Sequence, residues 1–288
     1  GRRSVYASLL MAVSRSLDDT RAASFHAARA AELAPVTVPV VRQSASVLAR
    51  CGRVEEALAI ARNTFLFDPG AGTRILESLL PLLGRAGVDR GVADDPDAWL
   101  AWSRSLERRG HRDEALAWME QAATRWPGQP RTIQFLAVRA FASGDNERLQ
   151  ALFPEDLTLP GEPEHALLFG YRAVSSALQE NRVGVIRDID TALELQGGNP
   201  SVLRVCGDAW NLIGEAEQAA DLWRRGVFLP SGSYPDGVRI ELLVRLARHE
   251  ESRMRFRIAL DFWRQILDIK PEHPEARQRV DDLTRFRR

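Results

Sequence analysis

The chain has 288 residues, and its 39 Lys and Arg residues balance 39 Asp and Glu residues, so the formal net charge is zero. This balance argues against a nucleic-acid-binding protein, because such proteins carry an excess of positive charge. Only one basic residue is a lysine, a preference typical of a GC-rich bacterial genome. The two cysteines, Cys51 and Cys206, lie far apart in the sequence, and we expect small buried residues rather than a disulfide.

The N-terminal sequence is Gly-Arg-Arg, without a methionine, so we expect the chain to be a piece of a longer protein. The apolar stretch 5–13 that follows the two arginines could mimic a signal peptide or the end of a membrane helix. It is shorter than the roughly 20 residues that a membrane-spanning helix needs. We therefore expect it to be the first helix of an array, and no other apolar run approaches the length of a membrane span.

Residues 96–127 contain the clearest pattern of the chain, which predicts two amphipathic helices joined at Gly110. The apolar residues of both helices recur at spacings of three and four, the period of a helix with one buried face. They are Trp99, Trp102 and Leu106 in the first helix, and Ala115, Leu116, Met119 and Ala122 in the second. Gly110 stands where the end of a helix favours the left-handed conformation, and Pro127 ends the second helix.

This pair of helices recurs along the chain, most visibly at the turn between them. The sequence 52–59 aligns with 110–117, and a third copy of the turn starts at Gly214. Pro35 and Pro69, which close successive units, are 34 residues apart. A helix-turn-helix period of 34 residues is that of the tetratricopeptide repeat, and the chain resembles that superfamily.

One copy of the family pattern shows the resemblance best. The pattern has an early aromatic residue, small residues where the helices cross, a turn glycine and a closing proline. These positions fall on Trp99, Ser103, Gly110, Ala115, Ala122 and Pro127. Small residues let two helices cross closely while large ones fill the groove beside them. The resemblance implies an all-α solenoid, a right-handed superhelix of about seven helix pairs with a C-terminal capping helix.

The first predicted sub-array, 1–154, contains repeats at about 4–37, 38–71, 96–129 and 130–154. An irregular segment at 72–95 interrupts it. There we expect one helix from Thr73 to about Leu83 and then a loop-like stretch, 84–95. Because helix pairs must alternate, the odd helix needs a partner, such as a short turn of helix around 86–92, or it bends the array.

Residues 155–163 are rich in proline and glycine and are predicted to be a linker. The second sub-array, 164–288, follows. Its first repeat is degenerate, because Glu180 stands where the turn glycine should be. Residues 274–288 form a polar helix with few apolar positions, which is typical of a capping helix.

No motif of catalysis or metal binding is found. None of the five histidines pairs with a cysteine or carboxylate at a metal-ligand spacing, and no phosphate-binding or nucleophile motif occurs. We expect no enzyme activity in this fragment, no metal and no cofactor. Four tryptophans, Trp99, Trp210, Trp223 and Trp263, fall on pattern positions and are predicted to lie in the core. The remaining three, Trp102, Trp118 and Trp126, are less fixed by the pattern, and one of them could be exposed.

In the family that the chain resembles, the first helix of each pair lines an inner, concave groove. The inward positions carried over to this sequence are Arg42, Arg104, Glu107, Gln134, Arg204, Asp208, Asn211, Arg248 and Glu251. These residues are predicted to contact a protein or peptide partner, with a merely solvated face as the alternative. The lysine and asparagine clamp with which some family members hold a terminal carboxylate is not reproduced.

Three functions remain open at this point. The first is a non-catalytic scaffold for protein–protein or peptide binding. The second is a periplasmic, soluble tail of a bacterial membrane enzyme that resembles an O-antigen ligase or polymerase, with the envelope polysaccharide machinery as partner. The third, and the one we favour least, is a helical-repeat enzyme that acts on glycans.

Overall fold

The computed structural model describes residues 5, 11–12, 19–230, 232 and 234–285, and the helix predicted over 5–13 lies largely outside them. The described residues form helices and turns, without a strand. None of these helices is long and apolar enough to cross a membrane. The chain divides into two compact units, residues 1–132 (unit 1) and 133–288 (unit 2), and each is described by itself.

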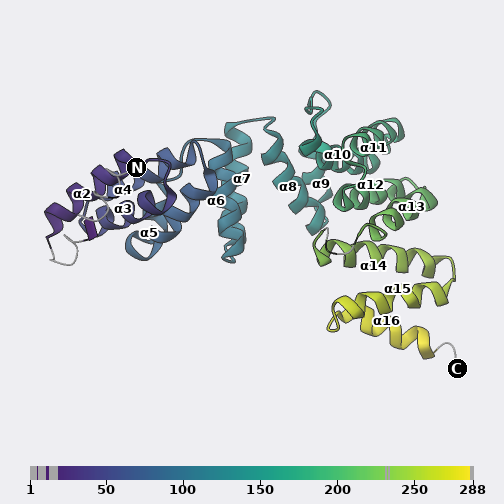
Figure 1. Ribbon diagram of the computed structural model, residues 1–288. Helices are drawn as coiled ribbons and strands as arrows, with labels where there is room; N and C mark the ends of the chain where they lie inside the picture. The colour runs from purple at the N-terminus through teal and green to yellow at the C-terminus, as the bar shows by residue number, and fades with distance from the viewer. Residues whose placement is uncertain (1–4, 6–10, 13–18, 231, 233, 286–288) are drawn as a thin grey trace. The chain divides into compact units, whose positions relative to one another are not determined.

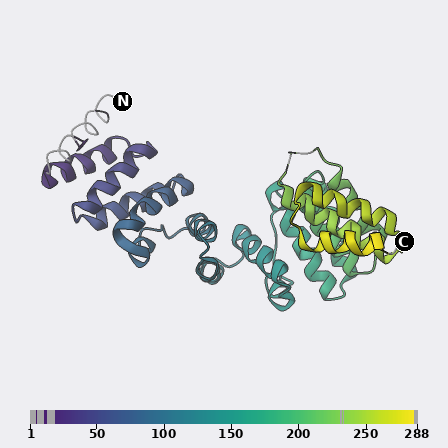
Figure 2. The same ribbon diagram turned by 90° about the horizontal axis from the view of Figure 1, so that it is seen from below.

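The helices of unit 1 follow one another side by side in chain order (Figure 1). Their bounds are α2 Thr20–Leu33, α3 Val38–Arg50, α4 Val54–Phe65, α5 Pro69–Asp89, α6 Pro96–Arg108 and α7 Arg112–Arg125, with the first residues of α8 Pro130–Ser143. Figure 2 shows the same order of α2 to α5 from another side. The first helices of successive pairs also contact one another, since α3 packs against α5 and α5 against α6.

Unit 2 continues the pattern of helix pairs and ends in a single helix (Figure 1). After α8 come α9 Asn146–Ala151, the 3-10 turn η1 Pro163–His165, α10 Ala166–Leu178, α11 Arg182–Gln196, α12 Pro200–Leu212, α13 Ala216–Val227, α14 Asp236–Ser252, α15 Phe256–Ile269 and α16 Pro274–Arg285. Seven helix pairs thus lie within the described residues, if α5 is counted as the pair described below, and α16 caps the array by packing on α15. The all-α repeat fold is confirmed.

The irregular segment is itself a helix pair of unequal lengths. Helix α5 begins at Pro69 rather than at Thr73, because Asp68 caps it by accepting a hydrogen bond from the Ala71 amide at 2.8 Å. At Gly84 the backbone leaves the helix, with φ 65° and ψ 179°, and a short second helical segment follows up to Asp89. The stretch predicted as a loop therefore contains the short partner helix that the alternation of the array requires.

The short segment is held to the next repeat by a buried tryptophan. Trp102 is fully buried, and its Nε1 donates a hydrogen bond to Asp89 Oδ1 at 3.0 Å. Arg85 pairs with the same carboxylate at 2.9 Å, and its guanidinium lies 4.9 Å from the centre of the Trp102 ring. A second ion pair at 3.0 Å joins Arg85 to Glu114 of α7. These contacts dock the irregular pair on the repeat of α6 and α7.

The turn between the two helices of a pair needs one residue in the left-handed conformation. Gly52, Gly110 and Gly214 supply it, with φ values of 79°, 87° and 84°. Glu180 and Met254 stand at the same point of their repeats with φ values of 60° and 56°. These two turns therefore keep the backbone geometry although they lack the residue that adopts it most easily.

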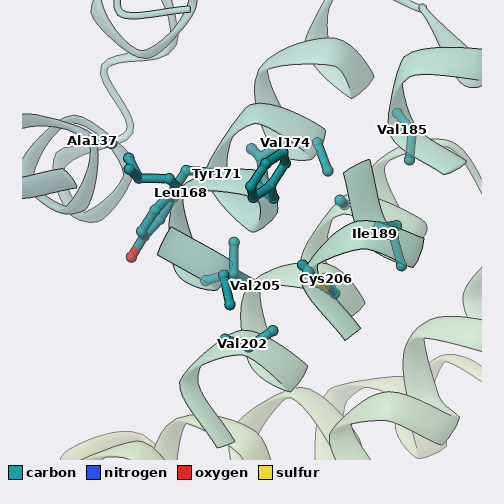
Figure 3. Packing of buried hydrophobic residues seen from close by; sticks show 14 of the residues in the cluster. Ala137, Leu168, Tyr171, Val174, Val185, Ile189, Val202, Val205 and Cys206 are labelled. Carbon is teal, nitrogen blue, oxygen red and sulfur yellow. The ribbon is translucent and has the colours of Figure 1, made fainter. Parts of the chain in front are cut away.

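One core cluster runs through the first part of unit 2 and includes residues from α8 to α13. Figure 3 shows part of it, with Tyr171 and Val174 on α10 and with Val205 and Cys206 on α12, which packs against α10. Cys206 is fully buried, and burial raises the pKa of its thiol to about 12. A small inert core residue, as expected, fits this position.

Residues 155–162 of the predicted linker are not helical and Pro163 begins η1, but this segment is not detached from unit 2. Leu159 is only 8% exposed and belongs to the same core cluster as Phe153 and Phe169. The backbone carbonyl of Leu157 accepts a hydrogen bond from Arg172 Nη1 at 3.3 Å. The division into sub-arrays 1–154 and 164–288 stays a prediction.

Candidate functional site: the first-helix wall

The surface made by the first helices of adjacent pairs is the natural place to look for a site, because these helices line up next to one another. We call it the first-helix wall. It comprises α3, α5 and α6 in unit 1, and α10, α12 and α14 in unit 2, where each helix contacts the next one in its unit. The predicted inward residues are examined below on each unit in turn.

In unit 1 the wall contains an open groove between α5 and α6, with a volume of about 650 Å³. The lining is charged at the rim, with four arginines and three carboxylates: Arg74, Arg104, Arg108, Arg131, Glu77, Asp97 and Glu107. Leu100 and Ala101 of α6, and Gly70 and Thr73 of α5, supply smaller and apolar surface. Two of the predicted residues, Arg104 and Glu107, therefore lie in a real concavity.

The charges of the groove are only partly neutralised within it. Arg131 pairs with Asp97 at 2.9 Å, and Arg108 lies 3.8 Å from Glu77. Ser105 donates a hydrogen bond to Glu77 as well. Arg104 lies on the exposed part of α6. A guanidinium in an open groove keeps most of its hydration and remains able to bind a carboxylate in two-point fashion.

In unit 2 the charges of the wall are paired with each other across successive repeats. Arg245 of α14 binds the carboxylate of Asp208 of α12 through both Nε and Nη2, the latter at 2.8 Å. Arg204 lies 3.8 Å from the same carboxylate and 3.1 Å from Glu241. The side chains of Arg204 and Asp208 are only 12% and 11% exposed. This part of the wall is a closed network.

Aromatic residues cover the other side of this network. The Tyr171 hydroxyl accepts a hydrogen bond from Arg204 Nη2 at 3.5 Å, and its ring meets Phe141 edge to face, with centroids 5.6 Å apart. Burial raises the pKa of Tyr171, and also that of Asp208, against the opposing effect of the hydrogen bond from Arg245. Both shifts express how little water reaches the network.

The predicted residues of α14 are likewise used inside the chain. Arg248 binds Glu275 of α16 through two hydrogen bonds, each 2.9 Å long. Glu251 accepts a hydrogen bond from Trp263 Nε1 and lies 3.8 Å from Arg279. These contacts tie α14 to the two helices that follow it.

The remaining predicted residues lie apart from both features. Arg42 on α3 and Asn211 on α12 are exposed, and Gln134 on α8 is half-buried. The structure therefore brings together Arg104 with Glu107, and Arg204 with Asp208, but it does not unite the nine predicted residues in one site.

Sequence reasoning did not select several residues of the groove. Asp97 and Arg108 lie one helical turn or two from Arg104 on α6, so extending its face at spacings of three and four would have found them. Arg74 on α5 and Arg131 at the start of α8 carry no such signal, because only the fold brings them to α6.

A second group that the sequence analysis did not anticipate lies at the start of α10. Ligand atoms of Glu162, Glu164 and His165 all lie within 4.8 Å of one another. The signal was present as a carboxylate three residues before a histidine, a spacing that one turn of helix can close. The prediction of a linker over 155–163 does not select it, because it treats Glu162 as part of a segment without structure of its own.

The tryptophans divide in a way that the pattern predicts only in part. Trp102 and Trp263 are fully buried, and Trp223 is 4% exposed. Trp99, which was predicted to lie in the core, is half-buried and meets Trp118 and Trp126 edge to face, with ring centroids 4.6 and 5.0 Å away. Both of these partners, like Trp210, are half-buried.

Comparison with known proteins bears on the fold. The profile of the tetratricopeptide repeat family matches residues 96–139. No curated protein sequence matches the chain. A tetratricopeptide repeat protein from Parabacteroides merdae is 11% identical with a TM-score of 0.52, over 99% of this chain and 100% of the other.

Two further solved structures are similar. The structure of the APC/C hetero-tetramer Cut9-Hcn1 gives 17% identity and a TM-score of 0.50 over 96% of this chain, which spans about half (54%) of the matched chain. TTC0263, a thermophilic tetratricopeptide repeat protein of Thermus thermophilus, gives 18% identity and a TM-score of 0.49, over 66% of this chain and 99% of the other. Identities this low speak for the fold alone. The tetratricopeptide repeat profile thus matches one part of the chain, residues 96–139, and the fold of the chain is similar to that of solved tetratricopeptide repeat proteins.

Proposed function

We propose that the chain is a non-catalytic scaffold for protein–protein interaction, and that the groove between α5 and α6 holds an extended segment of the partner. The observation that carries the proposal is the open, arginine-rich groove on the first-helix wall of unit 1. Its volume of about 650 Å³ is in the range of pockets that enclose a ligand of several side chains.

Unit 1 is favoured over unit 2 as the binding surface because the arginines of the two walls differ in their ion pairs within the chain. On the wall of unit 2, Arg204, Arg245 and Arg248 bind carboxylates of their own chain. A partner would have to displace those carboxylates before it could bind the guanidiniums. Breaking the largely buried pairs of Arg204 and Arg245 is costly, whereas the more exposed pair of Arg248 contributes less. On the wall of unit 1, Arg74, Arg108 and Arg131 also lie near carboxylates of the chain, but Arg104 is exposed and no ion pair of its own with a described residue has to be broken.

The chemistry of the groove favours a segment with acidic side chains spaced along an apolar stretch. Four arginines against three carboxylates leave a small positive excess in the lining. The exposed Arg104 guanidinium would bind a carboxylate of the segment, and the half-buried Ala101 beside it would contact an apolar side chain. The partner is therefore proposed to be an acidic, partly apolar peptide segment.

The test is a selection of random twelve-residue peptides displayed on phage against the full chain. Peptides that bind are then measured by fluorescence anisotropy against the parent and against Arg104→Glu. The matched control is Arg29→Glu, the same charge change on α2, whose arginine lies outside the groove and is 56% exposed. Both variants should fold, since exposed substitutions usually change stability by no more than about 0.5 kcal/mol.

The proposal expects enrichment of Asp and Glu in the selected peptides. Arg104→Glu should weaken binding at least about tenfold, because like charges that face each other at an interface are strongly unfavourable, whereas Arg29→Glu should not. Selected peptides that bind both variants as they bind the parent would exclude this groove as the site. A scaffold role through another surface would then have to be sought.

A further inference from the structure

We propose that Glu162, Glu164 and His165 form a binding site for a divalent transition-metal ion of the Zn²⁺ type. The three residues offer one imidazole nitrogen and two carboxylate oxygens, all within 4.8 Å of one another. They come from four consecutive residues at η1, directly before α10. Among the described residues this is the only group of three such side chains within that reach.

His165 is the residue that distinguishes this group from a cluster of surface carboxylates. The residue is 7% exposed, and its Nδ1 forms no hydrogen bond with any described residue. Buried polar atoms are nearly always satisfied, so an unsatisfied imidazole nitrogen calls for an explanation. The nitrogen faces Glu162, whose Oε2 lies 3.2 Å away.

The separation of these two atoms suits a shared metal ion. With Zn–N and Zn–O bonds of about 2.1 Å and a tetrahedral angle, two ligand atoms lie about 3.4 Å apart. The Nδ1 to Oε2 distance of 3.2 Å is close to that value. A carboxylate oxygen of the exposed Glu164 lies within 4.8 Å of the other two ligand atoms and is the candidate third ligand.

The backbone holds the ligands in place before any ion binds. Pro163 restricts the chain between the first and second ligands, and the His165 amide donates a hydrogen bond to the Glu162 carbonyl at 2.9 Å. The 3-10 turn also contacts both α10 and α11. A preorganised backbone lowers the entropy that binding would otherwise cost.

The donor set indicates the class of ion. Imidazole is a common ligand of Zn²⁺ and of other first-row transition metals, whereas Ca²⁺ and Mg²⁺ prefer oxygen ligands alone. Three protein ligands leave at least one coordination position of a tetrahedral ion for water or for a group of another molecule. The site would join the segment that ends at η1 to the start of α10.

A simpler account of the same residues has to be distinguished. A protonated histidine can pair with a carboxylate, and carboxylates at the start of a helix interact favourably with its dipole. The chain contains such a pair elsewhere, His111 with Glu114 at 3.0 Å, and both side chains are about half exposed. That pair belongs to no three-residue group among the described residues, so it provides the matched control.

The test uses the full chain after treatment with a chelator. Zn²⁺ binding is measured by isothermal titration calorimetry, and Co²⁺ is added in a parallel sample to record its visible absorption, which reports coordination by protein ligands. The variants are Glu162→Gln, Glu164→Gln, His165→Ala and the control His111→Ala. Both glutamates are exposed, so the Gln variants are expected to keep the fold, which circular dichroism verifies.

The proposal expects one Zn²⁺ per chain in the parent and in His111→Ala, with Ca²⁺ not bound. Each Gln variant should bind Zn²⁺ at least about tenfold more weakly, because loss of even an outer-shell partner can cost that much. No measurable binding of Zn²⁺ by the parent, or unchanged affinity in both Gln variants, would overturn the site. An equal loss of Zn²⁺ affinity in His111→Ala would also overturn the site. Glu162 and Glu164 would then act only as an ion-pair partner of His165 and as favourable charges at the start of α10.

Discussion

Arg172 of α10 binds the carboxylate of Asp188 of α11 through two hydrogen bonds, each 2.8 Å long, and the aspartate side chain is completely buried. A third contact comes from Arg187, whose Nε lies 3.1 Å from the same carboxylate. Arg172 also reaches the carbonyl of Leu157. One guanidinium thus joins both helices of a pair to the segment that precedes them.

This relationship predicts that removal of one partner is far more costly than replacement of both. Asp188→Ala leaves the arginine without its carboxylate and should lower the free energy of unfolding by about 3–5 kcal/mol. The double variant Arg172→Met, Asp188→Leu should lose much less, because no buried charge remains. Urea unfolding of the two variants provides the measurement. A double variant as unstable as Asp188→Ala would show that the pair itself stabilises the fold.

Overpacking should be severe where two helices cross. Ala115 of α7 is fully buried, so Ala115→Trp has no room and should destabilise the chain by about 1–3 kcal/mol or more. Ala117, two residues along the same helix, is exposed, and Ala117→Trp serves as the control with a small effect. Equal thermal melting of the two variants would mean that the assignment of the buried face of α7 is wrong.

The turn residues offer a stabilising substitution. Glu180 has a φ of 60°, a conformation that costs a non-glycine residue roughly 1–2 kcal/mol. Glu180→Gly removes this strain but adds freedom to the unfolded chain, so the net gain in stability should be about 0.5–1 kcal/mol. The reverse change, Gly110→Ala at a φ of 87°, should destabilise. Chemical denaturation of both variants should show a higher free energy of unfolding for Glu180→Gly and a lower one for Gly110→Ala.

His249 predicts a dependence of stability on pH. Burial lowers its pKa from the ordinary 6.5; Arg224 and Arg255 act in the same direction, and Glu250 opposes them. When the pH falls below about 6.5, the unfolded chain takes up a proton that the folded chain does not yet bind. Stability should therefore decrease as the pH is lowered through this range and increase again on return to neutral pH.

The measurement is the melting temperature between pH 7.5 and 5.5, for the parent and for His249→Gln. The variant should show a shallower decrease, since the titrating group is gone. A His249→Gln slope as steep as that of the parent would assign the pH dependence to other groups.

The sequence predicts the fold well because each repeat carries its own local signals. Gly110 and Gly214 mark turns that are left-handed in the structure, and the apolar period of 96–127 gives both helices of its pair. Such signals act within a few residues, so no knowledge of distant contacts is needed. The degenerate turn at Glu180 lacks the signal, yet it has the same left-handed geometry.

The candidate site is predicted less well, because position on a helix face does not reveal the partner of a side chain. Arg104 and Arg204 both occupy predicted inward positions, six and ten residues before the turn glycines Gly110 and Gly214 of their repeats. In the structure Arg104 is exposed in a groove, whereas Arg204 is 12% exposed and held by Glu241 and Tyr171. The carboxylate that neutralises Arg204 comes from the next repeat, 37 residues away in sequence, and no local pattern indicates that pairing.

This difference yields a further prediction about stability. Arg204→Glu places a negative charge beside Asp208 and Glu241 and should cost about 2 kcal/mol or more, because hydrogen bonds to charged groups are lost. Arg104→Glu should leave the free energy of unfolding almost unchanged. The two variants are compared by guanidinium unfolding under the same conditions. Equal destabilisation would show that Arg104 also has a structural role.

The most direct test of the central proposal maps where a bound peptide lies. A peptide selected against the full chain is synthesised with a photoreactive benzophenone group at its centre, cross-linked to the chain and located by mass spectrometry. The account predicts cross-links to residues of α5 and α6 that line the groove, such as Arg74, Ala101 and Arg104, and their loss on competition with unlabelled peptide. Cross-links confined to α12 and α14, or to the second helices of the pairs, would contradict it.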